Sequence, residues 1–591
     1  MFGSPFLRMW LLFAWKLVLM MVIYLYGAFS VAAMFLLFLY SMYLYYGLSF
    51  YVLFEEGEAV PWEDARDALI ETGKTFGWFI FLFVFLFVTD YYYIKEIFFY
   101  DNLMFWLFGF PVAGLLCILF TDEDDVNLIR YHALAYSLIT FVLSVFLFYE
   151  YLSSQLLYDH RFCSKLFDAP LFMNVEYALS IDGLNIWFVL LTTFLFPLVV
   201  MVSWETVQKR AKLFFALLLF LEFLLLNVFC AEELMVFYVM FEASVIPMFL
   251  LIGLWGSTDR RIYASFKFFF YTLVGSILMF TLVLWLYFSF GTTNMGYLLS
   301  VRFSFFTQVL VFIAFFSSFA VKVPMTPVHL WLPEAHVEAP TGISVLLAGI
   351  LLKTGGYAFI RFVLPLCFDA AQFFSPFIYV LSIVAVVYGS LVAIVQTDLK
   401  KMIAYSSVAH MNLAMIGIFS GSLAGLQGSL YLMLTHGIVS SGLFVCVGVL
   451  YDRYHTRIIR YYGGLVSFMP WFALLFVMLV LGNISFPGTG GFVAEFMLLF
   501  DIFAKNALVA LLAGLGMILG AVYTVWLYNR VMFGYVGSNI SHYADLNFRE
   551  FFVLLVLVVI MIFMGVYPSI FLEFANPKLI WINELIRTRF I

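Results

Sequence analysis

Long apolar runs follow one another along almost the whole chain. A helix needs about 20 apolar residues to cross the hydrocarbon core of a bilayer. Runs of that length begin near residues 9, 30, 77, 103, 130, 186, 211, 233, 264, 306, 340, 374, 402, 424, 470, 506 and 551. The pattern therefore predicts an all-α membrane protein with about 14 core transmembrane helices and about three extra N-terminal spans.

The composition agrees with a membrane protein and excludes several other classes. Hydrophobic residues make up 65% of the 591 residues and charged ones only 11%, whereas soluble domains are about a quarter charged. The net charge is −7 and no basic run is present, so we expect no nucleic-acid partner. The five cysteines are scattered without a CxxC pair, so we expect no metal site and no cofactor in this chain.

Basic residues gather in alternate loops, which predicts the orientation of the helices. Loops on the inner side of a membrane hold the excess of Lys and Arg. The loops with few cations contain Arg302, Arg361 and Lys505. The richer loops contain Lys209, Arg210, Lys212, Arg260, Arg261, Lys267, Lys400, Lys401, Arg453, Arg457 and Arg460. We call the side of these richer loops the basic side, and we expect it to face a mitochondrial matrix or a bacterial cytoplasm.

Two of the expected spans are interrupted by proline at matching places. One reads SFAVKVPMTPVHLWLPEAH at 318–336 and the other reads LGNISFPGTGGFVAEF at 481–496. Backbone groups freed by such a break are tolerated only beside a cavity, and a matched pair of broken helices is typical of inverted-repeat transporters. We therefore expect two inverted repeats of five helices, at 211–366 and 367–535. The other expected divisions are an extension at 1–100, core helices at 101–210, and a C-terminal helix and tail at 536–591.

Ionisable side chains inside the apolar runs are the candidate functional residues. A charge near the bilayer centre is costly, so such residues are usually functional and face a bundle interior or a water-filled cavity. Simpler interpretations stay open: Lys322 could extend to the membrane surface, Glu222 could lie beside lipid, and a single histidine is often a hydrogen-bonded core residue. The candidates are Glu242, Lys322, Lys353, His410, His436 and Glu495, with Glu222 as an accessory candidate.

Several segments resemble the antiporter-like membrane subunits of respiratory complex I. The similarity is carried by VFYVMFEASVIPMFLLIGLWG (236–256), AVKVPMTPVHLWLPEAHVEAPTGISVLLAGILLKTGGY (320–357), QTDLKKMIAYSSVAHMN (396–412), THGIVSSGLFVCVGVLYDRYHTR (435–457) and FPGTGGFVAEF (486–496). The segments keep the family's order and cover most of 180–535. The short polar tail implies that the long lateral helix at the end of one related subunit is absent here.

The resemblance implies a proton path. Glu242 and Lys322 would form an ion pair, Lys353 would be the central relay, and Glu495 would lie toward the exit. Ordered water would join these groups to His410, His436 and either His329 or His336.

The resemblance also implies a setting, the mitochondrial inner membrane. NADH, FMN, iron–sulfur clusters and ubiquinone would bind to other subunits. The partners would be other membrane-arm subunits, including neighbouring antiporter-like chains, together with lipids and lineage-specific supernumerary subunits.

Residues 1–100 depart from the family pattern and would be a lineage-specific extension. Three alternative functions remain open from the sequence. A cation/proton antiporter or membrane hydrogenase subunit would share the same fold and motifs. A purely structural membrane-arm subunit would not need the buried charges. A quinone-binding role cannot be tested by composition, because aromatic residues are abundant everywhere in the chain.

Overall fold

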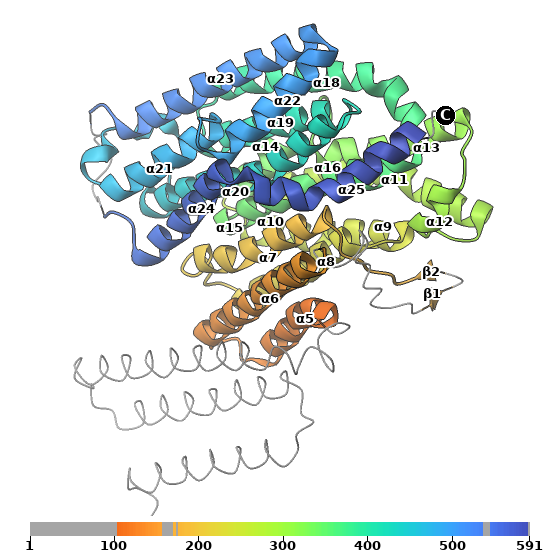
Figure 1. Cartoon of the computed structure of the whole chain (residues 1–591). Coiled ribbons are helices and arrows are strands. Elements are labelled where there is room, and N and C mark those ends of the chain that lie inside the picture. The colour runs from red at the N-terminus through yellow and green to blue at the C-terminus, as the bar shows by residue number, and fades with distance from the viewer. Residues whose placement is uncertain (1–102, 156–169, 173–174, 536–543, 589–591) are drawn as a thin grey trace, which may run out of the picture. The chain divides into compact units, whose positions relative to one another are not determined.

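The computed structural model describes residues 103–155, 170–172, 175–535 and 544–588 of the chain. The extension expected at 1–100 therefore lies outside the described residues. The described part is almost entirely helical, with one pair of short antiparallel strands, β1 (Pro170–Phe172) and β2 (Val175–Glu176) (Figure 1). The expected all-α fold class is confirmed.

Twelve of the described helical segments are long and apolar enough to cross a membrane. Two expected spans are not among these twelve. They are α19 (Leu399–Ile418), which carries two lysines and a histidine, and α21 (Pro470–Asn483), which has only 14 residues. The twelve segments and these two helices together account for the 14 core spans that the hydrophobic pattern predicts.

The helices follow the expected divisions of the chain, although no independent observation tests those boundaries. Before the first repeat come α5 (Leu103–Phe120), α6 (Val126–Gln155) and α7 (Asn185–Val202). The 211–366 segment contains α8 (Ala211–Cys230), α9 (Leu234–Ala243), α10 (Val245–Trp255), α11 (Arg261–Phe290), α12 (Met295–Ser300), α13 (Phe305–Lys322), α14 (Trp331–Glu338), α15 (Thr341–Leu346), α16 (Leu352–Ala358) and α17 (Leu364–Leu366).

The remaining helices belong to the second repeat and the C-terminal segment. The 367–535 segment contains α18 (Phe368–Val395), α19, α20 (Leu423–Tyr454), short 3-10 turns at Ile459–Tyr461 and Leu465–Ser467, α21, α22 (Gly490–Lys505) and α23 (Ala507–Met532). After it come α24 (Phe548–Val566) and α25 (Pro568–Thr588), drawn in dark blue in Figure 1.

Both predicted helix breaks are present. Helix α13 ends at Lys322 and α14 begins at Trp331, while α21 ends at Asn483 and α22 begins at Gly490. Two further irregularities were not predicted. Ser244 separates α9 from α10 directly after Glu242, and π-helical turns at Leu347–Leu351 and Phe359–Val363 flank α16. Such π turns are frequent at functional sites because they rotate side chains out of the regular register.

Two segments form the centre of the described structure. In both Thr341–Leu366 and Leu423–Tyr454, the whole most apolar window is buried inside the protein. They approach closely through two glycines, since a Cβ on Gly437 would lie 3.0 Å from the Gly349 carbonyl oxygen. Side chains on these two segments therefore face protein neighbours and not lipid.

The polar tail at the C-terminus is itself a helix, α25, which packs on α20. Its buried residues Ala575, Leu579 and Ile582 lie three and four positions apart, so they form one apolar stripe. Lys578 of this helix lies 3.3 Å from Asp182, which also pairs with Arg361. Burial alone would raise the pKa of Asp182, but these two cations outweigh burial and hold that pKa below its usual range. The charged group thus links α25 to the start of α7.

Candidate proton-transfer site

Lys353 lies at the centre of the molecule on α16 and is fully buried. Its Nζ donates to the Ala348 carbonyl oxygen, which a π-helical turn exposes, and to Nδ1 of His436 at 2.9 Å. Because Nδ1 of His436 accepts this bond, the ring carries its own proton on Nε2 when Lys353 is charged. The lysine therefore has two acceptors and no carboxylate, which leaves it able to give a proton to His436.

A second pair continues this arrangement on α19 and α22. The ring centroids of His436 and His410 are 5.6 Å apart. Nδ1 of His410 lies 3.1 Å from Oε1 of Glu495, whose side chain is almost completely buried. Nε2 of each histidine has no protein hydrogen-bond partner among the described residues. One water could bridge two such nitrogens, so Lys353, His436, His410 and Glu495 form a nearly continuous row, which we call the relay row.

Glu242 and Lys322 do not form the direct ion pair that the resemblance implied. No carboxylate lies within 4.0 Å of the Lys322 ammonium group in the described structure, and Nζ instead sits 4.3 Å from the centroid of the Phe241 ring. Glu242 is still close enough to attract Lys322, and its polar neighbour is the Ser276 hydroxyl. The expected direct ion pair is therefore wrong, because the ring of Phe241 takes the position of the carboxylate.

The backbones that carry Lys322 and Lys353 are in direct contact. A Cβ on Gly355 would lie 2.8 Å from Cγ2 of Val323 and 3.3 Å from Cβ of Lys322. Only glycine permits this approach of α13 to α16. The two lysines are thus neighbours through their helices, although their ammonium groups do not bond to one another.

The accessory candidates lie outside the relay row. Glu222 of α8 is fully buried and accepts a hydrogen bond of 2.7 Å from Thr140 of α6. Its environment is buried protein, so it does not lie beside lipid. His329 and His336 are also buried, and neither ring has a hydrogen-bond partner among the described residues. The structure brings none of these three into direct contact with the row.

Two charged residues were missed as candidates and were interpreted only as loop cations. Arg361 lies inside the Thr341–Leu366 span and is paired with Asp182. Its position eight residues after Lys353 in the same apolar run was the available signal. Lys400 is buried at the first turn of α19, whereas its neighbour Lys401 is half-exposed. A pair of adjacent lysines cannot point in one direction on a helix, which was the signal for Lys400.

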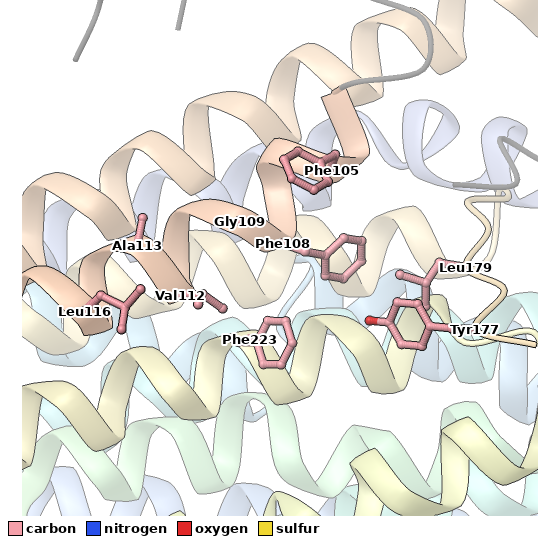
Figure 2. Close-up of a pocket in the computed structure, with 9 residues that line it drawn as sticks. All are labelled: Phe105, Phe108, Gly109, Val112, Ala113, Leu116, Tyr177, Leu179 and Phe223. Carbon is pink, nitrogen blue, oxygen red and sulfur yellow. The ribbon is translucent and has the colours of Figure 1, made fainter. Parts of the chain in front are cut away.

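A pocket of about 370 Å³ lies between α5 and α8, away from these charges (Figure 2). Its lining is apolar except for Tyr177 and includes Phe105, Phe108 and Phe223. Within the residues that the structure describes, no group of three or more His, Cys, Asp or Glu side chains could hold a metal ion. The buried chemistry of the described chain is therefore that of single proton-exchanging groups.

Together the broken helices and the buried row of lysine, histidine and glutamate define a multi-pass membrane protein of the antiporter-like class. The sequence model of the family described as "NADH:quinone oxidoreductase/Mrp antiporter, TM" matches residues 231–568. The chain belongs to this family, and the resemblance seen in its sequence is confirmed.

Known relatives agree with this assignment. The chain is 51% identical over 464 residues to NADH-ubiquinone oxidoreductase chain 4 of Arabidopsis thaliana, a match that covers 78% of this chain and 93% of the relative. It is 48% identical over 425 residues to NADH-quinone oxidoreductase subunit M of Rhodobacter capsulatus, which covers 70% of this chain and 83% of the relative.

Solved structures agree as well. A chain of respiratory complex I from Thermus thermophilus with bound NADH matches with a TM-score of 0.72 at 32% identity, covering 81% of this chain and 99% of that one. A chain of an archaeal membrane-bound sulfane sulfur reductase matches with a TM-score of 0.73, covering 81% of this chain and 98% of that one. At 21% identity it shows a shared fold only.

Proposed function

We propose that this chain conducts protons through Lys322, Lys353 and the relay row, as a membrane subunit of NADH:ubiquinone oxidoreductase. The observation that carries the proposal is the contiguous arrangement of Lys353, His436, His410 and Glu495 inside segments buried from lipid. Ionisable groups in a membrane interior are costly. A scaffold would not need four of them side by side.

The geometry supports a stepwise transfer. A proton on Nζ of Lys353 has His436 as its hydrogen-bonded acceptor. When Nδ1 takes that proton, the ring can release the other one from Nε2 toward His410, and His410 can pass a proton to Glu495. Lys353 then becomes neutral and must be reloaded. Lys322 on the adjoining helix is the nearest lysine of the row's other side and would supply it through water.

Glu242 would control this reloading. Its negative charge favours the protonated form of Lys322, and removing or neutralising that charge releases the proton. Moving one charge across about 100 mV requires roughly 2.3 kcal/mol. An electrostatic change in a neighbouring subunit could deliver that amount through Glu242.

The partners and location form the finer part of the proposal. Relatives named as subunits of NADH-ubiquinone oxidoreductase support assembly with other membrane-arm subunits, including neighbouring antiporter-like chains. We place the chain in the mitochondrial inner membrane, with NADH, FMN, iron–sulfur clusters and ubiquinone bound by other subunits. This chain itself would hold no cofactor.

Lys353→Met in the assembled complex tests the proposal. We expect proton translocation per NADH oxidised to fall by about 100-fold, since a proton-transfer group contributes on that scale. Lys209→Met, which removes an exposed loop lysine, is the matched control. Normal proton pumping by an assembled Lys353→Met complex would refute the path, and pumping that follows sodium would favour an antiporter instead.

A further inference from the structure

Lys400 is a buried cation that the proposed path does not use. It lies in the first turn of α19, on the basic side, and only 3% of its surface is exposed. Its Nζ donates 2.8 Å to the Ala339 carbonyl oxygen and 3.4 Å to the Ser344 hydroxyl. No carboxylate forms a salt bridge with it among the described residues. The ammonium group is therefore held by neutral acceptors alone.

A purely structural role explains this position poorly. The N-terminal end of a helix carries a partial positive charge, so a cation in the first turn is unfavourable. Burial adds a desolvation cost. The two acceptors of Lys400 could be satisfied by a neutral donor, which would avoid both penalties. A lysine here is better explained by a need for a group that can take up and release a proton.

Inward from Lys400, polar groups lead toward the relay row. The Ser344 hydroxyl that Lys400 contacts also donates to the His336 carbonyl oxygen at 3.2 Å. The His336 ring is fully buried, stacks on Phe444 at 4.5 Å, and has no hydrogen-bond partner for either nitrogen in the described structure. The charges of Lys400 and Lys353 both act on this ring, and His336 in turn acts on His436. His336 thus lies electrically between Lys400 and the row.

Outward from Lys400, the protein surface is hollowed. A hollow of about 310 Å³ lies among α7, α15, α20 and α24 and is lined in part by Thr341 and Val445. Thr341 lies between the two acceptors of Lys400 in sequence, and Val445 follows the residue that stacks on His336. The charged groups that face Lys400 or line this hollow are His336, Glu338, Asp398, Asp452, Arg457, Arg549 and Glu550.

We propose that Lys400 is the proton-loading residue at a basic-side mouth, and that it feeds the relay row through His336. In this step an N–H bond of the Lys400 ammonium breaks and, through water, an N–H bond forms on the His336 ring. The neutral Lys400 amine then regains a proton from the solvent of the hollow. The inference rests on the proposed function, because it supplies protons to the same row.

Lys400→Arg in the assembled complex tests the inference. Arginine keeps the positive charge and can donate to the same carbonyl, but it does not give up its proton near neutral pH. If Lys400 only supplies a charge, Lys400→Arg pumps normally; if Lys400 carries protons, pumping per NADH oxidised falls by about tenfold or more. Lys401→Met, which changes the half-exposed neighbour, is the matched control and is expected to pump normally.

A second variant guards against a simple misfit of the larger arginine. His336→Phe keeps the stack on Phe444 but removes both ring nitrogens. It is expected to reduce pumping to a similar extent, and the double variant with Lys400→Arg should lose little more, because both act in one route. Normal pumping by Lys400→Arg, or additive losses in the double variant, would overturn the inference. If Lys353→Met still abolishes pumping in that case, the proposed function stands and only the basic-side mouth falls.

Discussion

The two halves of the proposed path are built differently. From Lys353 to Glu495, each ionisable group contacts the next directly or lies within reach of one water. On the other side, Lys322 rests on the Phe241 ring and Glu242 acts on it only from a distance. The second half therefore has several groups that can substitute for one another, whereas the first half depends on a single lysine. Such a gap is where an outside electrical change could stop or start transfer.

The largest loss is expected from Lys322→Met. No other ionisable group in the described structure bridges the helices of Glu242 and Lys353, so water alone would have to span the distance. We expect proton translocation per NADH oxidised to fall by about 100-fold in reconstituted vesicles. If the variant complex assembles and pumps at more than about half the normal rate, the first half cannot depend on one lysine.

His410→Leu tests the redundancy of the second half. Removing this ring separates His436 from Glu495, but Tyr523, Ser406 and Asn483 lie close by and could hold water in its place. We therefore expect a loss of about tenfold, at the low end for a proton-transfer group, and clearly less than for Lys322→Met. His410→Gln, which can still bond to Glu495, should lose less again. Equal losses for His410→Leu and Lys322→Met would remove the contrast between the halves.

Phe241→Leu should have the smallest effect. The substitution removes the attraction between the ring and the Lys322 ammonium, which is worth about 0.5–2 kcal/mol. Leucine still fills most of the space, so we expect pumping to change by only about threefold, at the lower end of that range. Phe237→Leu is a suitable control, because that ring packs on the Phe241 ring at 5.4 Å and is not the ring beneath the ammonium group. A similar change in both variants would indicate a packing effect.

Much of the fold could be predicted because its causes are local in sequence. Spanning helices follow from runs of apolar residues, and both broken helices follow from proline. The π turns around Lys353 and the interruption at Ser244 could not be predicted, because the surrounding sequence is ordinary helix-forming sequence. They depend on how neighbouring helices pack.

The site was predictable as a set of residues but not as an arrangement. Glu242, Lys353 and Glu495 stand out because a charge in an apolar run is rare. That His436 bonds to Lys353, while a phenylalanine lies against Lys322, depends on side chains meeting across helices far apart in sequence. Lys400 was missed because a lysine near a helix end normally reaches water, and only the folded structure shows it turned inward.

The full burial of the Thr341–Leu366 and Leu423–Tyr454 windows has a consequence for the surrounding bilayer. Acyl chains do not touch these central helices, so the charge-carrying groups are insulated from the thickness and headgroup composition of the membrane. Changes in lipid would act on the outer helices and on assembly with neighbours, while the electrical environment of Lys353 would stay nearly constant.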